Sequence, residues 1–238
     1  MPGFEQKINA RKLIRDNSPK IFLISIIFII LSTVMSELQF RLPGTMDVYD
    51  QYVQQLLTGE KQSLSTIYSY FRPSGVPFAV VLWFLSVVLD TGLKSYCLKT
   101  SRKQKGDHKD LFDGFLFFGK VILIQIISSI FIMMWSFLFI IPGIIAFYKY
   151  RQAYYILLDD PKKSALQCIS ESKHMMHGKK LDLFLLDLSF IGWLFLDYLV
   201  VIIMPLPFSL PIVSILLTPY FGLTCAGFYN QLINRLAV

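Results

Sequence analysis

The sequence predicts an all-α, polytopic membrane protein: a helix bundle of about six transmembrane helices, with amphipathic helices at the membrane interface. Three observations predict this fold class. First, the 238 residues are 54% hydrophobic and only 16% charged, whereas a soluble domain carries about 25% charged residues. Second, several uncharged runs approach or exceed the roughly 20 residues that one crossing needs. Third, prolines interrupt the longest of these runs, and basic residues between the runs mark which ends of the crossings face the cytoplasm.

Four uncharged runs indicate membrane-spanning segments. Two lie at 21–36 and 73–89, and two longer ones at 121–148 and 198–234. The last would form a helix roughly 55 Å long at about 1.5 Å per residue, far more than a hydrocarbon core of about 30 Å. The two longer runs must therefore be broken. The predicted helix breaks are Pro142, Gly143, Pro205, Pro207, Pro211 and Pro219. The predicted spans lie near 19–35, 76–98, 121–141, 143–158, 181–204 and 210–232.

Basic residues orient these spans, because short cytoplasmic loops retain lysine and arginine during insertion. With the N-terminus in the cytoplasm, six spans place 20 of the 23 Lys and Arg residues inside and leave Arg41, Lys61 and Arg72 outside. A single crossing over 121–158 would leave only 12 of 23 inside. We therefore expect one multi-pass membrane domain over 1–238, with both termini in the cytoplasm.

Two segments between spans are predicted to lie at the membrane surface. The external loop 36–75 contains two short amphipathic patterns with helical spacing. On the cytoplasmic side, Asp160-Pro161 is typical of a helix start and Gly178 of a helix stop. The helix 161–177 would turn Ala165, Leu166, Ile169 and Met176 to one face. We expect it to be an interfacial helix that is attracted to anionic lipid at the cytoplasmic face of the bilayer.

Five ionisable residues fall inside predicted spans, where each costs about 2.5–3.5 kcal/mol at a helix centre. The candidate intramembrane polar network consists of Asp90, Lys149, Arg151, Asp187 and Asp197. Lys149 and Asp197 lie at similar predicted depths and can pair, and Lys94 lies one helical turn from Asp90. Either the network forms a path for a proton, ion or small solute, or its charge pairs only fix the packing of the helices.

The sequence contains no catalytic signature such as a phosphate-binding loop, a zinc-protease motif or a nucleophile elbow. We expect no enzyme activity, no cofactor and no metal, since His174, His177 and Cys168 lack a fourth ligand. The sequence pI of about 9.2 reflects basic residues segregated by membrane side, which favours anionic lipid over nucleic acid as a partner.

The second half of the chain resembles an uncharacterised bacterial membrane-protein family known as domain of unknown function 975. The matching residues, in order, are Ile141–Ile144, Tyr155–Pro161, Ser172-Lys173, Met176, Gly178, Asp187–Trp193, Pro219-Tyr220, Thr224, Ala226, Phe228-Tyr229 and Leu232. The family is distantly similar to the membrane anchor of some glycerophosphodiester phosphodiesterases. The resemblance implies a bacterial plasma-membrane protein and brings no known activity or catalytic residues.

Three functions stay open at this point. The first is a non-enzymatic accessory or scaffold, or a subunit of an envelope export or resistance system with an unidentified membrane-protein partner. The second is a small-solute or ion-coupled transporter, which would need a water-accessible cavity at Asp187 or Lys149. The third is a lipid-processing enzyme, which would gather polar side chains at one membrane face.

Overall fold

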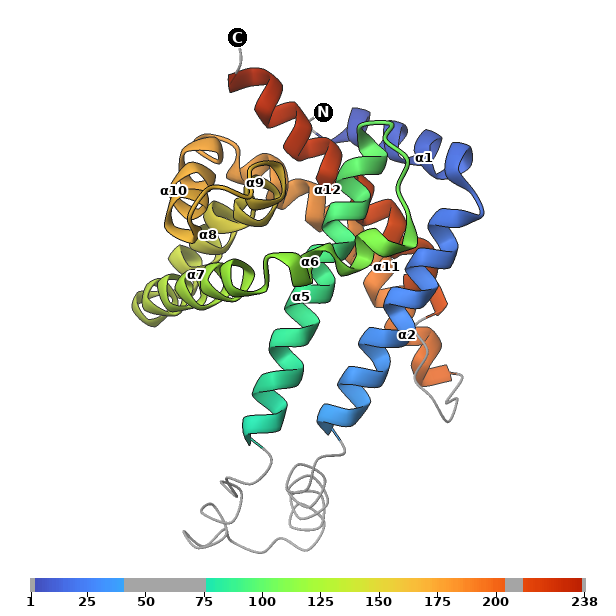
Figure 1. The fold of residues 1–238 in the computed structure, drawn as a ribbon, viewed down its shortest axis with the longest axis horizontal. Coiled ribbons are helices and arrows are strands. Elements are labelled where there is room, and N and C mark those ends of the chain that lie inside the picture. Colours follow the sequence, from blue (N-terminus) through green and yellow to red (C-terminus); the bar gives the residue numbers. More distant parts are fainter. Residues whose placement is uncertain (1–2, 41–75, 204–211, 237–238) are drawn as a thin grey trace, which may run out of the picture. The chain divides into compact units, whose positions relative to one another are not determined.

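The structure is a computed structural model that describes residues 3–40, 76–203 and 212–236. Every element in these ranges is a helix (Figure 1). The chain divides into two compact units, one of residues 1–29 and 87–238 and one of residues 30–86. Helices α2, Lys20–Phe40, and α5, Val76–Ser101, run through both units. Most of the predicted external loop, including its two amphipathic patterns, lies outside the described residues.

The basic N-terminal segment forms helix α1, Phe4–Asn17, which packs against α12, Ile212–Leu236. The sequence analysis did not predict α1. Its Lys7 ammonium lies 4.5 Å from the centroid of the Phe190 ring, and its Arg11 guanidinium lies 5.6 Å from that of Tyr220. Such contacts let basic side chains pack on aromatic rings. The basic segment is therefore part of the helical packing of the larger unit.

The segment after α5 packs closely on that helix through two glycines. This segment contains a short 3₁₀ helix, η1, His108–Phe112, and helix α6, Asp113–Leu116. A Cβ on Gly92 would lie 1.7 Å from the Leu111 carbonyl oxygen, and one on Gly114 would lie 2.1 Å from that of Val88. Only glycine allows two backbones to approach this closely.

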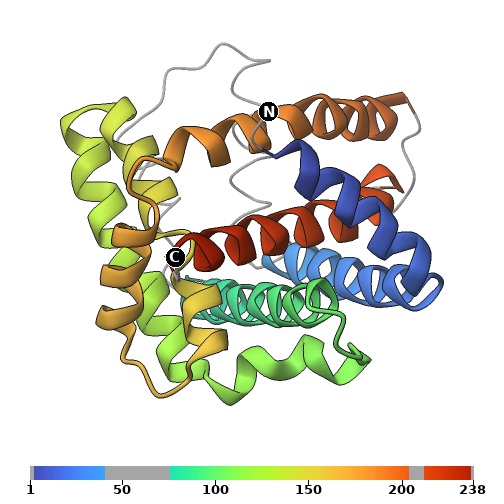
Figure 2. The ribbon, with the colours of Figure 1, turned by 90° about the horizontal axis from the view of Figure 1, so that it is seen from above.

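Helices α7, Phe118–Leu138, and α8, Ile140–Tyr150, form a hairpin and lie side by side in Figures 1 and 2. The predicted break at Pro142 and Gly143 lies three residues too late, because the chain turns at Phe139, whose backbone is extended. Pro142 occupies the first turn of α8, where its missing N–H costs no helical hydrogen bond. Gly143 faces α7, and a Cβ there would lie 1.9 Å from the Ser136 hydroxyl oxygen.

The predicted span 143–158 is not one continuous helix. Helix α8 ends at Tyr150, and helix α9 covers only Ala153–Asp159. At about 1.5 Å per residue, the 11 residues of α8 reach roughly 17 Å, which is too short for a crossing.

The predicted interfacial helix 161–177 is shorter than expected and begins later. Helix α10 covers Ala165–Met175, because Ser164 and Gln167 form a reciprocal capping box. Leu166, expected on the apolar face, is 63% exposed, whereas Cys168 and Ser172 are buried. Gly178 has a φ of +72°, which fits the predicted glycine stop after the helix.

Helices α11, Lys180–Ile203, and α12 pack against each other. The predicted breaks Pro205, Pro207 and Pro211 lie outside the described residues. Pro219 lies inside α12 and does not end it, so its prediction as a break is wrong. A proline removes one N–H donor from a helix, and packing against α1 and α11 holds the rest of α12 together.

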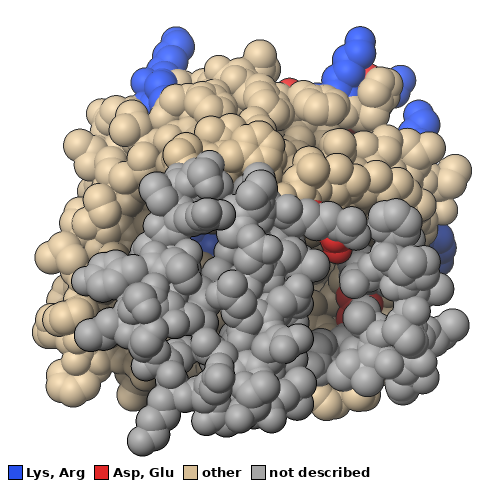
Figure 3. Space-filling view, turned by 90° about the horizontal axis from the view of Figure 1, so that it is seen from below, with Lys and Arg blue, Asp and Glu red and all other residues tan. Residues whose placement is uncertain are grey.

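Three described helical stretches are long and apolar enough to cross a membrane: Lys20–Leu38, Pro77–Ser101 and Phe118–Leu138. These stretches indicate a membrane protein, and the predicted number of six crossings is not confirmed. In both ribbon views, α7 runs in a different direction from the 87–101 part of α5, which belongs to the same unit (Figures 1 and 2). The visible non-grey surface in Figure 3 is mostly uncharged, with lysine and arginine side chains at its margin.

Candidate functional site

The turn between α8 and α9 positions Arg151, the central cation of the candidate polar network. Ser172 of α10 holds this turn: its hydroxyl donates to the Lys149 carbonyl at 2.8 Å and accepts from the Gln152 N–H at 3.2 Å. Both Ser172 and Gln152 are buried. A buried backbone group needs a hydrogen-bond partner, and a side chain of α10 supplies one where the helix is interrupted.

Arg151 forms an ion pair with Asp187 of α11. Each of these two side chains is 18% exposed. The Tyr148 hydroxyl donates to Asp187 Oδ2 at 3.0 Å, so the carboxylate binds two groups from α8 and the turn that follows it. Two of the five predicted network residues, Arg151 and Asp187, are therefore in direct contact. Their ion pair connects the α8–α9 turn to α11.

The surroundings of the Arg151 guanidinium are largely aromatic. Its central carbon lies 5.5–6.0 Å from the ring centroids of Phe147, Tyr148 and Phe221. Its Nη2 also lies 3.6 Å from the sulfur of Cys225 on α12. Asp187 Oδ1 is buried and has no hydrogen-bond partner among the described residues. This site, which we call the Arg151 cluster, consists of Tyr148, Arg151, Asp187 and Cys225.

The other predicted network residues are held in separate places. Asp90 pairs with Lys94 one turn along α5, as expected from their spacing. Asp197 accepts from the Val213 N–H at 3.1 Å and from the Ser214 hydroxyl, so it binds the N-terminal end of α12. The expected pairing of Asp197 with Lys149 is therefore wrong. A carboxylate at a helix N-terminus satisfies free N–H groups there, and this competing position accounts for the difference.

Lys94 connects its ion pair to further polar groups of α7 and α9. Its ammonium lies 4.7 Å from the ring centroid of Tyr154. The Tyr154 hydroxyl donates to Gln125 of α7, whose amide in turn donates to Ser129 at 3.1 Å. The five predicted residues therefore do not form one network. Arg151 and Asp187 belong to the Arg151 cluster, Asp90 pairs with Lys94, Asp197 caps α12, and Lys149 lies apart from these groups.

Sequence reasoning missed an ion pair that joins the ends of α5 and α9 to each other and to α12. Arg102, just after α5, makes a two-pronged contact with Asp159 at the end of α9, with N–O distances of 2.5 and 2.8 Å. The Tyr229 hydroxyl of α12 donates to the same carboxylate at 2.9 Å, and Arg102 Nε donates to Asn230 at 2.9 Å. The Asp159 carboxylate raises the pKa of Arg102. No local sequence pattern marks this pair, because Arg102 and Asp159 lie 57 residues apart.

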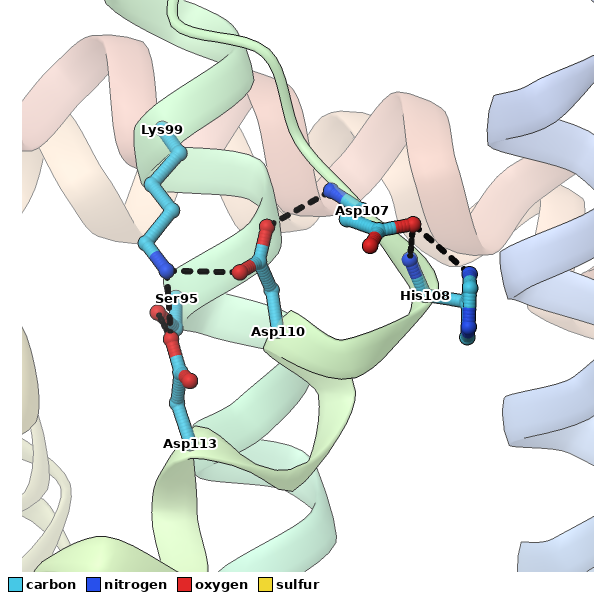
Figure 4. A network of polar contacts seen from close by, with 6 residues as sticks. All are labelled: Ser95, Lys99, Asp107, His108, Asp110 and Asp113. Atoms are coloured by element: carbon cyan, nitrogen blue, oxygen red, sulfur yellow. Dashed lines mark hydrogen bonds and ion pairs between the residues drawn. The ribbon is translucent and has the colours of Figure 1, made fainter.

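A second cluster, shown in Figure 4, attaches η1 and α6 to α5. The Lys99 ammonium lies 2.7 Å from Asp110 Oδ1 and 2.6 Å from Asp113 Oδ2. The Ser95 hydroxyl donates to Asp113 at 2.6 Å, and the Asp107 N–H donates to Asp110 at 2.8 Å. All of these carboxylates serve contacts within the protein, which indicates a structural role.

The described residues also enclose a cavity of about 1070 Å³ between α1, the C-terminal half of α12 and the end of α5. Its lining is mixed in charge, with Glu5 and Asp16 opposed by Lys12, Lys103 and Arg235. Arg151 and Asp187 do not line it.

The three described cysteines are all buried. Cys168 lies outside any predicted span, and burial raises the pKa of its thiol to about 11. No group of three His, Cys, Asp or Glu residues that could hold a metal ion occurs in the described part of the chain.

Comparison with known proteins gives one match. A family model described as protein of unknown function (DUF975) matches residues 139–236, which contain α8 to α12. This match confirms the resemblance predicted from the second half of the sequence. No curated protein and no solved structure matches the chain.

Proposed function

We propose that this chain, whose residues 139–236 match the DUF975 family of unknown function, is a non-enzymatic scaffold or accessory protein of the bacterial plasma membrane. It would act by contact with lipid and with a membrane-protein partner, such as an export or resistance complex. Both termini would lie in the cytoplasm, as the distribution of lysine and arginine predicts.

The Arg151 cluster carries this proposal. Arg151 and Asp187 are directly paired, and Tyr148 adds a hydrogen bond to the pair. Arg102 and Asp159 are likewise occupied by each other and by Tyr229 and Asn230. Charged groups that bind one another across helices fix the packing of those helices, and loss of one partner costs about 3–5 kcal/mol when the other stays buried. This pattern is typical of structural charge pairs.

A proton- or ion-coupled transporter is the second candidate, and one observation favours it. Asp187 Oδ1 is buried without a hydrogen-bond partner among the described residues. A free carboxylate oxygen inside a membrane protein is a place where a proton can bind. The two functions therefore differ in what the Asp187 carboxylate does, and the same residue tests both.

The test compares a single substitution with a neutral double substitution. Asp187→Asn leaves the Arg151 charge buried without a partner, and we expect it to lower the melting temperature of the purified protein. Asp187→Asn with Arg151→Gln removes both charges, and we expect it to recover most of that loss, because neutral replacement of a buried ion pair costs little.

Proton flux is measured on the same three proteins in dye-loaded vesicles with an imposed potential. A scaffold should give the same flux in wild-type and both variant vesicles as in protein-free vesicles. A wild-type flux that both variants abolish would contradict the scaffold and support the transporter. Equal melting temperatures in the single and double variants would show that the pair is not structural.

A further inference from the structure

Helices α7, α8 and α10 enclose a groove of about 590 Å³, a volume within the range of small-molecule sites. We call it the α7–α10 groove. Part of its lining is apolar, with Phe131, Met134, Trp135 and Leu138 from α7 and Leu166 and Ile169 from α10. The rest is polar, with Lys149, Tyr150, Ser170 and Lys173. The groove therefore combines the apolar and the polar chemistry that an amphiphile needs.

The two lysines bring positive charge that no carboxylate in the described part of the chain pairs with. Neither Lys149 nor Lys173 forms an ion pair with a carboxylate of the described residues. Glu171, the acidic residue of α10, instead pairs with Lys163 at 2.6 Å. The Lys149 ammonium lies 5.4 Å from the ring centroid of Tyr150, which keeps it at the groove wall. Two unpaired ammonium groups favour an anionic headgroup with more than one acceptor oxygen.

The apolar wall continues into the exposed tip of the α7–α8 hairpin. Phe137 is 90% exposed, and Phe139, Ile140 and Ile141 are 71–77% exposed. Side chains of this kind belong in hydrocarbon. A ligand whose headgroup contacts the lysines could therefore extend its chains along Trp135 and Leu138 into the same hydrocarbon layer.

We propose that the α7–α10 groove is a binding site for one anionic phospholipid. The phosphate lies between the Lys149 and Lys173 ammonium groups, where the Ser170 hydroxyl can also donate a hydrogen bond. An acyl chain packs against Phe131, Trp135 and Leu138. A free phosphate would use the lysines and leave this apolar wall bare, so the groove favours a membrane lipid. This site goes beyond the proposed function, because it can exist in a scaffold and in a transporter alike.

Trp135 provides a direct probe of the site. With Trp83→Phe and Trp193→Phe, Trp135 is the one remaining tryptophan of the chain. The protein is placed in phosphatidylcholine nanodiscs that contain increasing fractions of a lipid with brominated acyl chains, which quenches nearby tryptophan fluorescence. We expect brominated phosphatidylglycerol to reach half-quenching at about a 30-fold lower fraction than brominated phosphatidylcholine, since each lysine near an anionic headgroup contributes about a fivefold preference.

Substitutions then separate the groove from general attraction to an anionic membrane. Lys149→Gln with Lys173→Gln should remove the preference, and Lys173→Gln alone, at an exposed position, should lower it about fivefold. The control pair Lys105→Gln with Lys162→Gln makes the same charge change at exposed lysines that do not line the groove, and it should keep the preference.

Three results of the quenching experiments would overturn the proposal. These are equal quenching by the two brominated lipids, an unchanged preference in the Lys173→Gln protein, and an equal loss of preference in the control pair. Competition by inorganic phosphate at matched ionic strength would assign the lysines to a soluble anion, which also contradicts a lipid site. None of these results bears on proton flux or on the stability of the Arg151–Asp187 variants, so the proposed function is tested separately.

Discussion

Among single residues, Asp159 joins α9 to the end of α5 and to α12, although it lies outside the predicted polar network. Its two carboxylate oxygens bind both nitrogens of the Arg102 fork, and Tyr229 donates to one of them. Tyr229 also stacks on Tyr155 of α9, with 5.1 Å between the ring centroids. Within the described residues, the neighbouring Asp160 carboxylate accepts only a local hydrogen bond, from the Lys162 N–H at 3.1 Å. The adjacent carboxylates of Asp159 and Asp160 therefore contribute very differently to the packing of the helices.

This difference gives a prediction for two isosteric substitutions. Asp159→Asn removes the charge that binds Arg102, and we expect it to destabilise the protein by about 1.5–3 kcal/mol, the range for hydrogen bonds to charged groups. For a chain of this size, that loss lowers the melting temperature by about 3–12 °C. Asp160→Asn keeps an acceptor for the Lys162 N–H and should change the melting temperature little. Thermal unfolding of both variants in the same detergent measures the difference, and equal shifts would contradict the assigned role of Asp159.

At the scale of elements, local sequence signals predicted some features well and others poorly. The glycine stop at Gly178 and the Asp90–Lys94 pair depend on residues a few positions apart, and the structure contains both. The start of α10 was misplaced because two capping signals compete within five residues. Asp160-Pro161 gave the earlier start, whereas Ser164 and Gln167 form the cap that is observed.

Long-range contacts explain the features that the sequence could not reveal. The division of the predicted span 143–158 depends on Ser172, which lies 20 residues beyond Gln152 and supplies the hydrogen bonds at the turn. The partner of Arg151 likewise lies 36 residues away on α11. No local pattern marks such partners. The candidate residues could be identified because a charged side chain in a membrane span is energetically unfavourable, but most of their pairings could not be predicted.

The hairpin of α7 and α8 gives an element-scale prediction. Gly143→Ala would place a Cβ 1.9 Å from Ser136 Oγ and 2.9 Å from Ser136 Cα. Because the second atom belongs to the backbone, α7 and α8 must move apart. We expect the free energy of unfolding to fall by about 1–3 kcal/mol, the range typical of overpacking. The melting temperature should fall with it. Gly192→Ala makes the same chemical change in α11, where a Cβ would meet no described atom beyond its chain neighbours and its own helix backbone within 4 Å, and it should not lower the melting temperature. A destabilised Gly192→Ala protein with an unaffected Gly143→Ala protein would contradict this packing.

For the whole molecule, the open point is how many helices cross the membrane. Composition alone makes α7 a candidate crossing. Residues at its C-terminal end, Trp135 and Leu138, nevertheless share a groove with Leu166 and Lys173 of α10. The distribution of lysine and arginine predicts that α10 lies on the cytoplasmic side. A helix that crossed from the cytoplasm would carry Trp135 and Leu138 to the outer side, away from an α10 in that position. The shared groove therefore favours a hairpin that enters the membrane and returns to the same side.

Such a hairpin changes the number of crossings without changing the orientation of the chain. Helices α2, α5, α11 and α12 would cross, and the α7–α8 hairpin would dip into the hydrocarbon between cytoplasmic segments. Lys149 and Arg151 then lie on the cytoplasmic side, whereas the six-span prediction places them within the span 143–158 and counts them with the cytoplasmic residues that follow it. The distribution of 20 of 23 lysine and arginine residues on that side is the same in both arrangements, which is why charge counting cannot distinguish them.

Labelling of single cysteines in whole cells can distinguish the two arrangements. In a background with Cys97, Cys168 and Cys225 replaced by serine, a membrane-impermeant maleimide is added outside the cells. Lys61→Cys, in the predicted external loop, should react in both arrangements, and Lys105→Cys should react only after the cells are opened.

The deciding position is Phe139→Cys at the tip of the hairpin, where the Phe139 side chain is 72% exposed on the protein surface. A returning hairpin keeps this tip in hydrocarbon, where a thiol is rarely ionised and reacts slowly, so we expect no labelling from outside. Labelling at the rate of Lys61→Cys would instead place the tip in external water and support six crossings.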